Sequence, residues 1–65
     1  MWFVIVYDNE FKKRTYLKDY TVESEAGLDM DKQMHVHADD NADITVVEAK
    51  DLETLKRMYR RYFND

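Results

Sequence analysis

The chain of 65 residues contains no cysteine, no proline and a single glycine. Without cysteine it cannot form disulfides or hold zinc and iron–sulfur clusters through thiolates. One glycine is too few for a glycine-rich phosphate-binding loop, and the scarcity of glycine and proline excludes collagen-like and flexible-linker sequence. A chain of this length suffices for one small hydrophobic core, so we expect a single domain over residues 1–65.

The sequence also lacks a long hydrophobic run. Its longest apolar segment, residues 1–7, is much shorter than the ~20 residues needed to cross a bilayer. That segment has neither the preceding basic region nor the following small-residue cleavage site that characterise a secretory signal. We therefore expect a soluble, cytoplasmic protein without a membrane partner.

What the chain does contain is typical of a folded, acidic protein. Hydrophobic residues make up 45% and aromatic residues 14% of the sequence, whereas disordered segments are poor in aromatic residues. The net charge of −4 is unevenly distributed, because residues 19–43 carry eight acidic side chains and one basic side chain, while both ends are mildly basic. This acidic middle segment indicates a partner protein with a basic surface.

Four segments have strand patterns, approximately residues 2–7, 14–22, 33–38 and 44–49. The first is the clearest, because it consists of β-branched and aromatic residues. The third alternates apolar and polar side chains, as a half-buried strand does. Residues 23–32 contain the glycine and no clean period, so we expect a loop there, with a helical turn at most.

Residues 51–63 have the clearest helical pattern. Asp51 can serve as the N-cap, and the apolar residues Leu52, Leu55, Tyr59 and Tyr62 recur at helical spacing. Such a helix is about as long as a six-residue strand, so it can cover one face of a sheet. Together these elements predict an α+β fold: a three- or four-stranded antiparallel β-sheet, connected as a meander, with one C-terminal α-helix packed on one face.

The second face of this sheet needs cover as well, because the strand over residues 2–7 is apolar on both sides. We expect a partner to provide it, either a second copy or another protein. The alternative is that residues 23–32 fold over that face. The expected interface combines apolar and aromatic residues of the sheet with nearby carboxylates: Trp2, Val4, Val6, Tyr16, Tyr20, Asp39, Asp40 and Asp43.

The residue types give little support to catalysis. There is no cysteine nucleophile, and the one serine, Ser24, lacks the glycine pattern of a nucleophile elbow. We therefore expect a non-enzymatic protein-binding module that needs no cofactor. It would act as a small acidic regulator or inhibitor of another protein, and a homodimer is one arrangement that fits.

The alternative function is a nucleic-acid-binding regulator. In this interpretation the basic face of the C-terminal helix contacts phosphates through Lys56, Arg57, Arg60 and Arg61, and exposed tyrosines stack on bases. The net negative charge argues against it, because phosphate attraction dominates such binding.

A histidine pair is a candidate for metal binding. His35 and His37 would share one face of the strand predicted over residues 33–38, which suits two metal ligands. No third ligand is evident at a matching position, so we expect no metal site.

Overall fold

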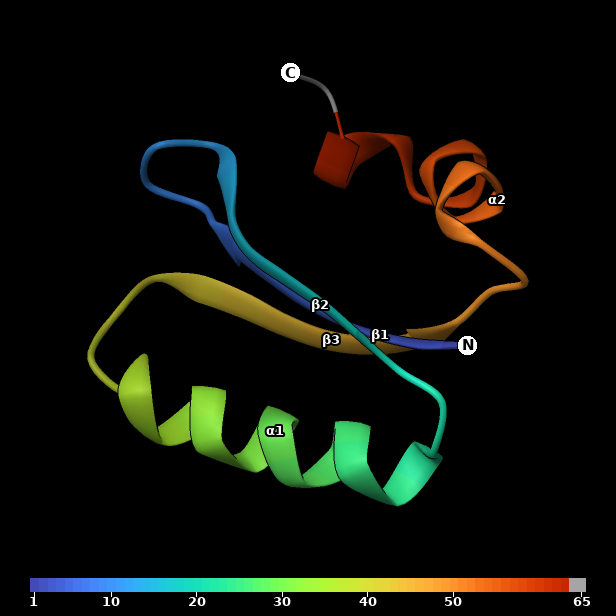
Figure 1. Ribbon diagram of the computed structural model, residues 1–65. Helices are drawn as coiled ribbons and strands as arrows, with labels where there is room; N and C mark the ends of the chain where they lie inside the picture. Colours follow the sequence, from blue (N-terminus) through green and yellow to red (C-terminus); the bar gives the residue numbers. More distant parts are fainter. Residues whose placement is uncertain (64–65) are drawn as a thin grey trace.

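The computed structural model describes residues 1–63 and has an α+β fold in three layers (Figure 1). A three-stranded antiparallel sheet forms the middle layer, with helix α1 on one side and helix α2 and the 3-10 helix η1 on the other. The predicted class and the antiparallel sheet are thus confirmed. The elements are β1 (Trp2–Asp8), β2 (Lys13–Tyr20), α1 (Glu23–Val36), β3 (Ala42–Glu48), α2 (Leu52–Met58) and η1 (Arg60–Phe63).

The strand order, β2-β1-β3, differs from the predicted meander. β1 is the central strand and pairs antiparallel with both neighbours. The difference arises from α1, whose 14 residues span ~21 Å and carry the chain back along the sheet after β2. The chain therefore enters β3 from the end at which β2 began, and β3 runs parallel to β2 on the other side of β1.

The turn between β1 and β2 is held by its own polar groups. The Asp8 Oδ1 atom accepts hydrogen bonds from the backbone N–H groups of Glu10 (2.9 Å) and Phe11 (3.2 Å), as aspartate often does at turns. Lys12 has a left-handed backbone with φ of 55°. Thr15 is the extra residue of a β-bulge in β2.

The strand predicted over residues 33–38 is wrong, and so is the loop predicted over residues 23–32. Both segments belong mainly to α1 (Glu23–Val36). Glu, Ala, Leu, Met, Lys and Gln, which favour helices, dominate the segment, and two glutamates lie in the first turn, where negative charge stabilises a helix.

The side of α1 that faces the sheet is unusually polar. Its buried residues are Ala26, Asp29 and Gln33, which are spaced at i, i+3 and i+7. Met34 and Val36, which suggested a half-buried strand, are instead 53% and 62% exposed. Because polar side chains occupy buried positions and apolar ones face solvent, the segment shows no hydrophobic period of 3.6 residues.

The main hydrophobic core lies between the sheet and α2. Phe3 and Ile5 of β1 and Val47 of β3 pack with Leu55 of α2, and both Ile5 and Leu55 have no exposed surface. Asp51 is the N-cap of α2, as predicted, since its Oδ1 accepts a hydrogen bond from the Thr54 N–H at 2.8 Å.

The other face of the sheet is covered by the chain itself. Val4 and Val6 of β1 are fully buried on the side that α1 occupies. Of the two arrangements expected for this face, the structure therefore has the one in which residues 23–32 fold over it, as part of a helix. The fold does not require a partner to cover β1.

The single helix predicted over residues 51–63 is interrupted. α2 ends at Met58, Tyr59 is its C-cap with φ of −126°, and η1 follows. In the predicted apolar stripe, Leu55, Tyr59 and Tyr62 do pack in the core, but Leu52 is 40% exposed. None of the helices in residues 1–63 combines the length and the apolar character that a bilayer crossing requires.

Candidate functional site

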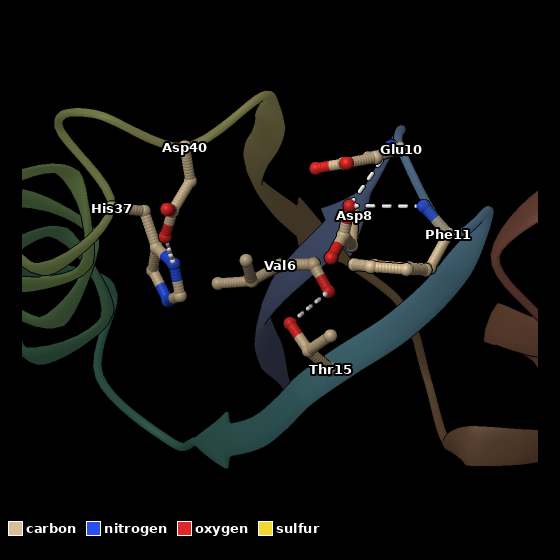
Figure 2. A network of polar contacts seen from close by, with 7 residues as sticks. All are labelled: Val6, Asp8, Glu10, Phe11, Thr15, His37 and Asp40. Carbon is tan, nitrogen blue, oxygen red and sulfur yellow. Dashed lines mark hydrogen bonds and ion pairs between the residues drawn. The ribbon is translucent and has the colours of Figure 1, made fainter.

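A pocket of about 240 Å³ lies at one end of the sheet, between the β1–β2 turn and the connection from α1 to β3 (Figure 2). A hydrogen bond from the Asn9 N–H to the Asn41 carbonyl (2.9 Å) ties these two chain segments together. The pocket is lined by Asp8, Glu10, Phe11 and Thr15 on one side and by His37, Asp39, Asp40, Asn41 and Ala42 on the other.

His37 and Asp40 form a closely spaced pair on the α1–β3 side. His37 is the C-cap of α1, and its Nδ1 atom lies 2.7 Å from Asp40 Oδ2. An ionised carboxylate can only accept a hydrogen bond, so we assign the hydrogen to Nδ1. The backbone supports this geometry, because the Asp40 N–H donates to the His37 carbonyl at 3.0 Å.

The β1–β2 side of the pocket is positioned by local hydrogen bonds. Asp8 is oriented by the turn that it stabilises, and Figure 2 shows its carboxylate on the side of the pocket opposite His37. The Thr15 hydroxyl donates to the Val6 carbonyl at 3.4 Å. Within the described residues this is the hydrogen bond of the Thr15 hydroxyl, and none joins it to His37.

The charge and the size of the pocket define what it can hold. Four carboxylates line it and no lysine or arginine does, so it suits a cation: the acidic residues are Asp8, Glu10, Asp39 and Asp40. Its volume is below the ~300–1,000 Å³ of pockets for drug-sized molecules. A single ammonium or guanidinium side chain matches this size and charge.

Phe11 adds an aromatic surface to the same pocket. Its side chain is 68% exposed, and the Lys13 Nζ atom lies 5.9 Å from the ring centroid, near the limit of a cation–π contact. A basic side chain entering the pocket could therefore place its methylene groups or its charge against this ring while its head group meets the carboxylates.

The residues of the interface predicted from sequence divide into two groups. Asp39 and Asp40 are exposed and line the pocket, and Asp43 lies 3.6 Å from Arg61 in an ion pair. The others belong to the sheet side that α1 covers: Val4 and Val6 are buried, whereas Trp2, Tyr16 and Tyr20 are half-buried. This pocket thus brings together two of the predicted residues, Asp39 and Asp40.

Tyr16 has a structural partner within the chain. Its hydroxyl donates to Asp29 Oδ2 at 2.7 Å, and Gln33 Nε2 donates to Asp29 Oδ1 at 3.2 Å. Burial acts to raise the pKa of the Asp29 carboxyl, but the hydrogen bonds from Tyr16 and Gln33 outweigh it and lower this pKa. Burial, together with the hydrogen bond to Asp29, raises the pKa of Tyr16.

The basic residues of the alternative function lie on the α2 side of the sheet. Lys56, Arg57 and Arg60 are exposed. Arg61 lies against the rings of Tyr7 (5.6 Å) and Tyr62 (5.1 Å). Tyr16 and Tyr20 are on the opposite, α1 side of the sheet, since they pair with Val6 and Trp2 and Tyr16 bonds to Asp29 of α1. The sheet therefore separates Tyr16 and Tyr20 from these basic residues, whereas Tyr7 and Tyr62 lie beside Arg61.

His35 and His37 do not have the geometry of a metal-ligand pair. Their segment is helical rather than extended, so positions two apart point about 200° apart around the helix. His35 Nδ1 lies 2.9 Å from the Asp31 carbonyl, and His37 pairs with Asp40. Residues 1–63 contain no group of three or more side chains suited to hold a metal ion.

Sequence reasoning missed the part of the pocket that comes from the β1–β2 turn. The turn itself can be recognised from Asp8 and Asn9, but nothing in the sequence places Glu10 or Phe11 beside residues 37–42. That proximity depends on α1 returning the chain to this end of the sheet. Comparison of the chain with protein-family models, curated proteins and solved structures finds no match.

Proposed function

We propose that the protein is a non-enzymatic protein-binding module, a small acidic regulator or inhibitor, that takes a lysine or arginine side chain of its partner into the acidic pocket. The observation that carries this proposal is a pocket of about 240 Å³ whose lining holds four carboxylates and one exposed aromatic ring but no lysine or arginine. Opposite charge, matching size and an aromatic wall are what a basic side chain needs.

The distribution of charge over the molecule supports a basic partner. Residues 23–41, which include α1 and one side of the pocket, carry six acidic side chains and one basic side chain. Residues 52–63, on the opposite side of the sheet, carry four basic side chains and one acidic side chain. A basic surface would therefore be steered toward the α1 side, and the residues that follow α1 form one wall of the pocket.

A hexa-arginine peptide is a direct probe of this pocket. In an NMR titration at low salt, the backbone amides of Phe11, His37 and Asp40 should shift first, and the shifts should weaken as salt is added. The double variant Asp39→Asn/Asp40→Asn removes two pocket charges with little change in shape. It should reduce the affinity about tenfold, which corresponds to roughly 1.4 kcal/mol.

The matched control is Glu23→Gln/Glu25→Gln, which removes the same net charge from exposed positions in the first turn of α1. It should bind the peptide nearly as the unaltered chain does. Equal loss in both double variants would mean that the peptide responds to net charge alone, and the pocket would not be a site. The same three proteins serve as baits for natural partners, which should be retained by the control and lost by Asp39→Asn/Asp40→Asn.

A further inference from the structure

The outer edge of β3 is the least protected part of the sheet. β3 pairs with β1 on one side, and no strand within residues 1–63 pairs with the other. The strand has the sequence Ala-Asp-Ile-Thr-Val-Val-Glu, with no lysine, proline or bulge. The edge formed by β2 is different, because it carries Lys13, Lys18 and the bulge at Thr15, which are features that discourage pairing with another chain.

The hydrogen bonds to β1 determine which β3 residues face outward. Met1 and Ala49 exchange two backbone hydrogen bonds of 2.9 Å, and the pair at the other end of the ladder is joined by the Asn9 N–H···O=C Asn41 bond. Hydrogen-bonded pairs alternate along an antiparallel ladder, so odd-numbered β3 residues bond to β1. The N–H and C=O groups of the even-numbered residues point away from β1: Ala42, Ile44, Val46 and Glu48.

We propose that two copies of the chain pair through this edge, antiparallel, with a twofold axis at Thr45. The outward residues are placed symmetrically about Thr45, because Ile44 and Val46 are each one residue away from it and Ala42 and Glu48 are each three residues away. Each outward residue of one copy therefore meets an outward residue of the other, and the whole of β3 is used. The result is a continuous six-stranded sheet whose ends are the two lysine-bearing β2 edges.

The side chains of β3 are compatible with this register. On the α1 side, Ile44 of each copy lies opposite Val46 of the other, which forms two apolar cross-strand pairs from half-buried residues. At the axis, Thr45 lies opposite its own copy. The two acidic residues avoid each other, because Asp43 is opposite Val47 and Glu48 is opposite Ala42. No like charges are placed in direct opposition, which favours a second copy as the occupant of this edge.

Salt distinguishes this pairing from binding of a basic partner. Each copy carries a net charge of −4, so long-range repulsion opposes the dimer and added salt should strengthen it. Salt weakens the interaction of an acidic pocket with a basic side chain. The two proposals share only Ala42 and otherwise rest on different residues, so either can fail without the other.

The first experiment measures mass by sedimentation equilibrium from about 10 µM to about 1 mM, since a pairing of this small area is expected to be weak. A monomer–dimer equilibrium that tightens with salt supports the proposal. A monomer over the whole range overturns it. Oligomers that keep growing beyond a dimer also overturn it, because they indicate open, head-to-tail pairing rather than a twofold axis.

Charge substitutions at Thr45 test the position of the axis. In the dimer the two copies of residue 45 form a non-hydrogen-bonded pair, with Cα atoms about 4.5 Å apart, so Thr45→Lys and Thr45→Glu should each abolish association by placing like charges together. A one-to-one mixture of the two variants should form a heterodimer. The matched control, Thr21→Lys at the exposed position directly after β2, should leave the dimer intact. Association unaffected by Thr45→Lys would overturn the proposal.

Hydrogen exchange on the unaltered chain provides a test that does not depend on a folded variant. The Ile44 and Val46 amides point away from β1 and would be hydrogen-bonded in the dimer, so their protection should rise with protein concentration. The Thr45 amide, which faces β1, should not change. Exchange of Ile44 and Val46 that is independent of concentration, in samples shown to be dimeric, would place the interface elsewhere.

Discussion

The bond between Tyr16 and Asp29 is the sharpest test of the packing of α1 on the sheet. Asp29 is only 8% exposed and accepts the Tyr16 hydroxyl at 2.7 Å and Gln33 Nε2 at 3.2 Å. Tyr16→Phe removes one oxygen atom and leaves a buried carboxylate with the longer of its two hydrogen bonds. Hydrogen bonds to charged groups contribute about 1.5–3 kcal/mol, so the free energy of unfolding at pH 7 should fall by about that amount.

A loss of this size is large for the whole protein. A domain of 65 residues has a free energy of unfolding of roughly 3–10 kcal/mol, and each kcal/mol corresponds to about 4–8 °C in Tm. Urea and thermal unfolding, followed by circular dichroism, can therefore measure the effect. The matched control is Tyr7→Phe, which removes the same atom from a half-buried tyrosine on the opposite face whose hydroxyl has no hydrogen-bond partner within residues 1–63.

The pH dependence gives an independent signature. The pKa of Asp29 is lowered in the folded state, so the stability it contributes is present above the unfolded value of about 3.9 and is lost as pH falls through the lower folded value. The pKa of Tyr16 is raised, so its contribution is present below about pH 10 and is lost as pH rises further. As pH is lowered, Tyr16→Phe should begin to lose stability at a higher pH than the unaltered chain. At alkaline pH it should not show the loss of stability that deprotonation of Tyr16 causes.

The reasoning would be refuted if Tyr16→Phe and Tyr7→Phe had equal stabilities at pH 7. The double variant Tyr16→Phe/Asp29→Asn separates the bond from the effect of each substitution alone, because additive losses would show that the two side chains do not interact.

Three further substitutions test other parts of the fold by chemical or thermal unfolding. Gly27→Ala should stabilise the protein by about 0.5–1 kcal/mol, since an added Cβ meets nothing within 4 Å and alanine favours the interior of α1; a loss of stability would contradict the helix. Leu55→Ala should cost about 2–5 kcal/mol because Leu55 is fully buried, and a near-neutral result would place α2 off the core. Asp51→Ala should lower Tm at pH 7, because it removes the N-cap of α2. The hydrogen bonds from Thr54 lower the pKa of Asp51, so the stability that Asp51 contributes is present above the usual aspartate pKa and is lost in acid. An unchanged Tm at pH 7 would show that Asp51 does not cap α2.

The parts of the fold that could be predicted are those in which apolar side chains are buried and polar side chains are exposed. β1 has apolar side chains at both odd and even positions and is buried on both faces. α2 has its predicted N-cap and a buried Leu55. In α1 the relation is reversed, because Asp29 and Gln33 are inside while Met34 and Val36 are outside. The buried polar groups are stabilised by specific partners such as Tyr16, and such partnerships cannot be recognised before the two elements are known to be adjacent.

The candidate site depends on this same helix. Asp39 and Asp40 could be proposed as contact residues from charge alone, but the pocket also needs the β1–β2 turn, which is about 30 residues earlier in the chain. Once residues 33–38 are treated as a strand, the sheet order changes and the two sides of the pocket separate. The central position of β1 has the same cause, since α1 is the crossover that places β3 beside it.

The acidic pocket and the β3 edge meet at Ala42, which lines the pocket and is also an outward residue of the edge strand. In the proposed dimer, Glu48 of the second copy lies opposite Ala42 and adds a carboxylate near the pocket. Dimerisation should therefore raise the affinity of each pocket for a basic peptide. By linkage, saturating peptide should raise the dimer affinity by the square of that factor, because the dimer has two pockets. Sedimentation with and without hexa-arginine measures this coupling. If the peptide binds in the pocket but leaves the dimer affinity unchanged, Glu48 does not reach the pocket, and the register centred on Thr45 is wrong.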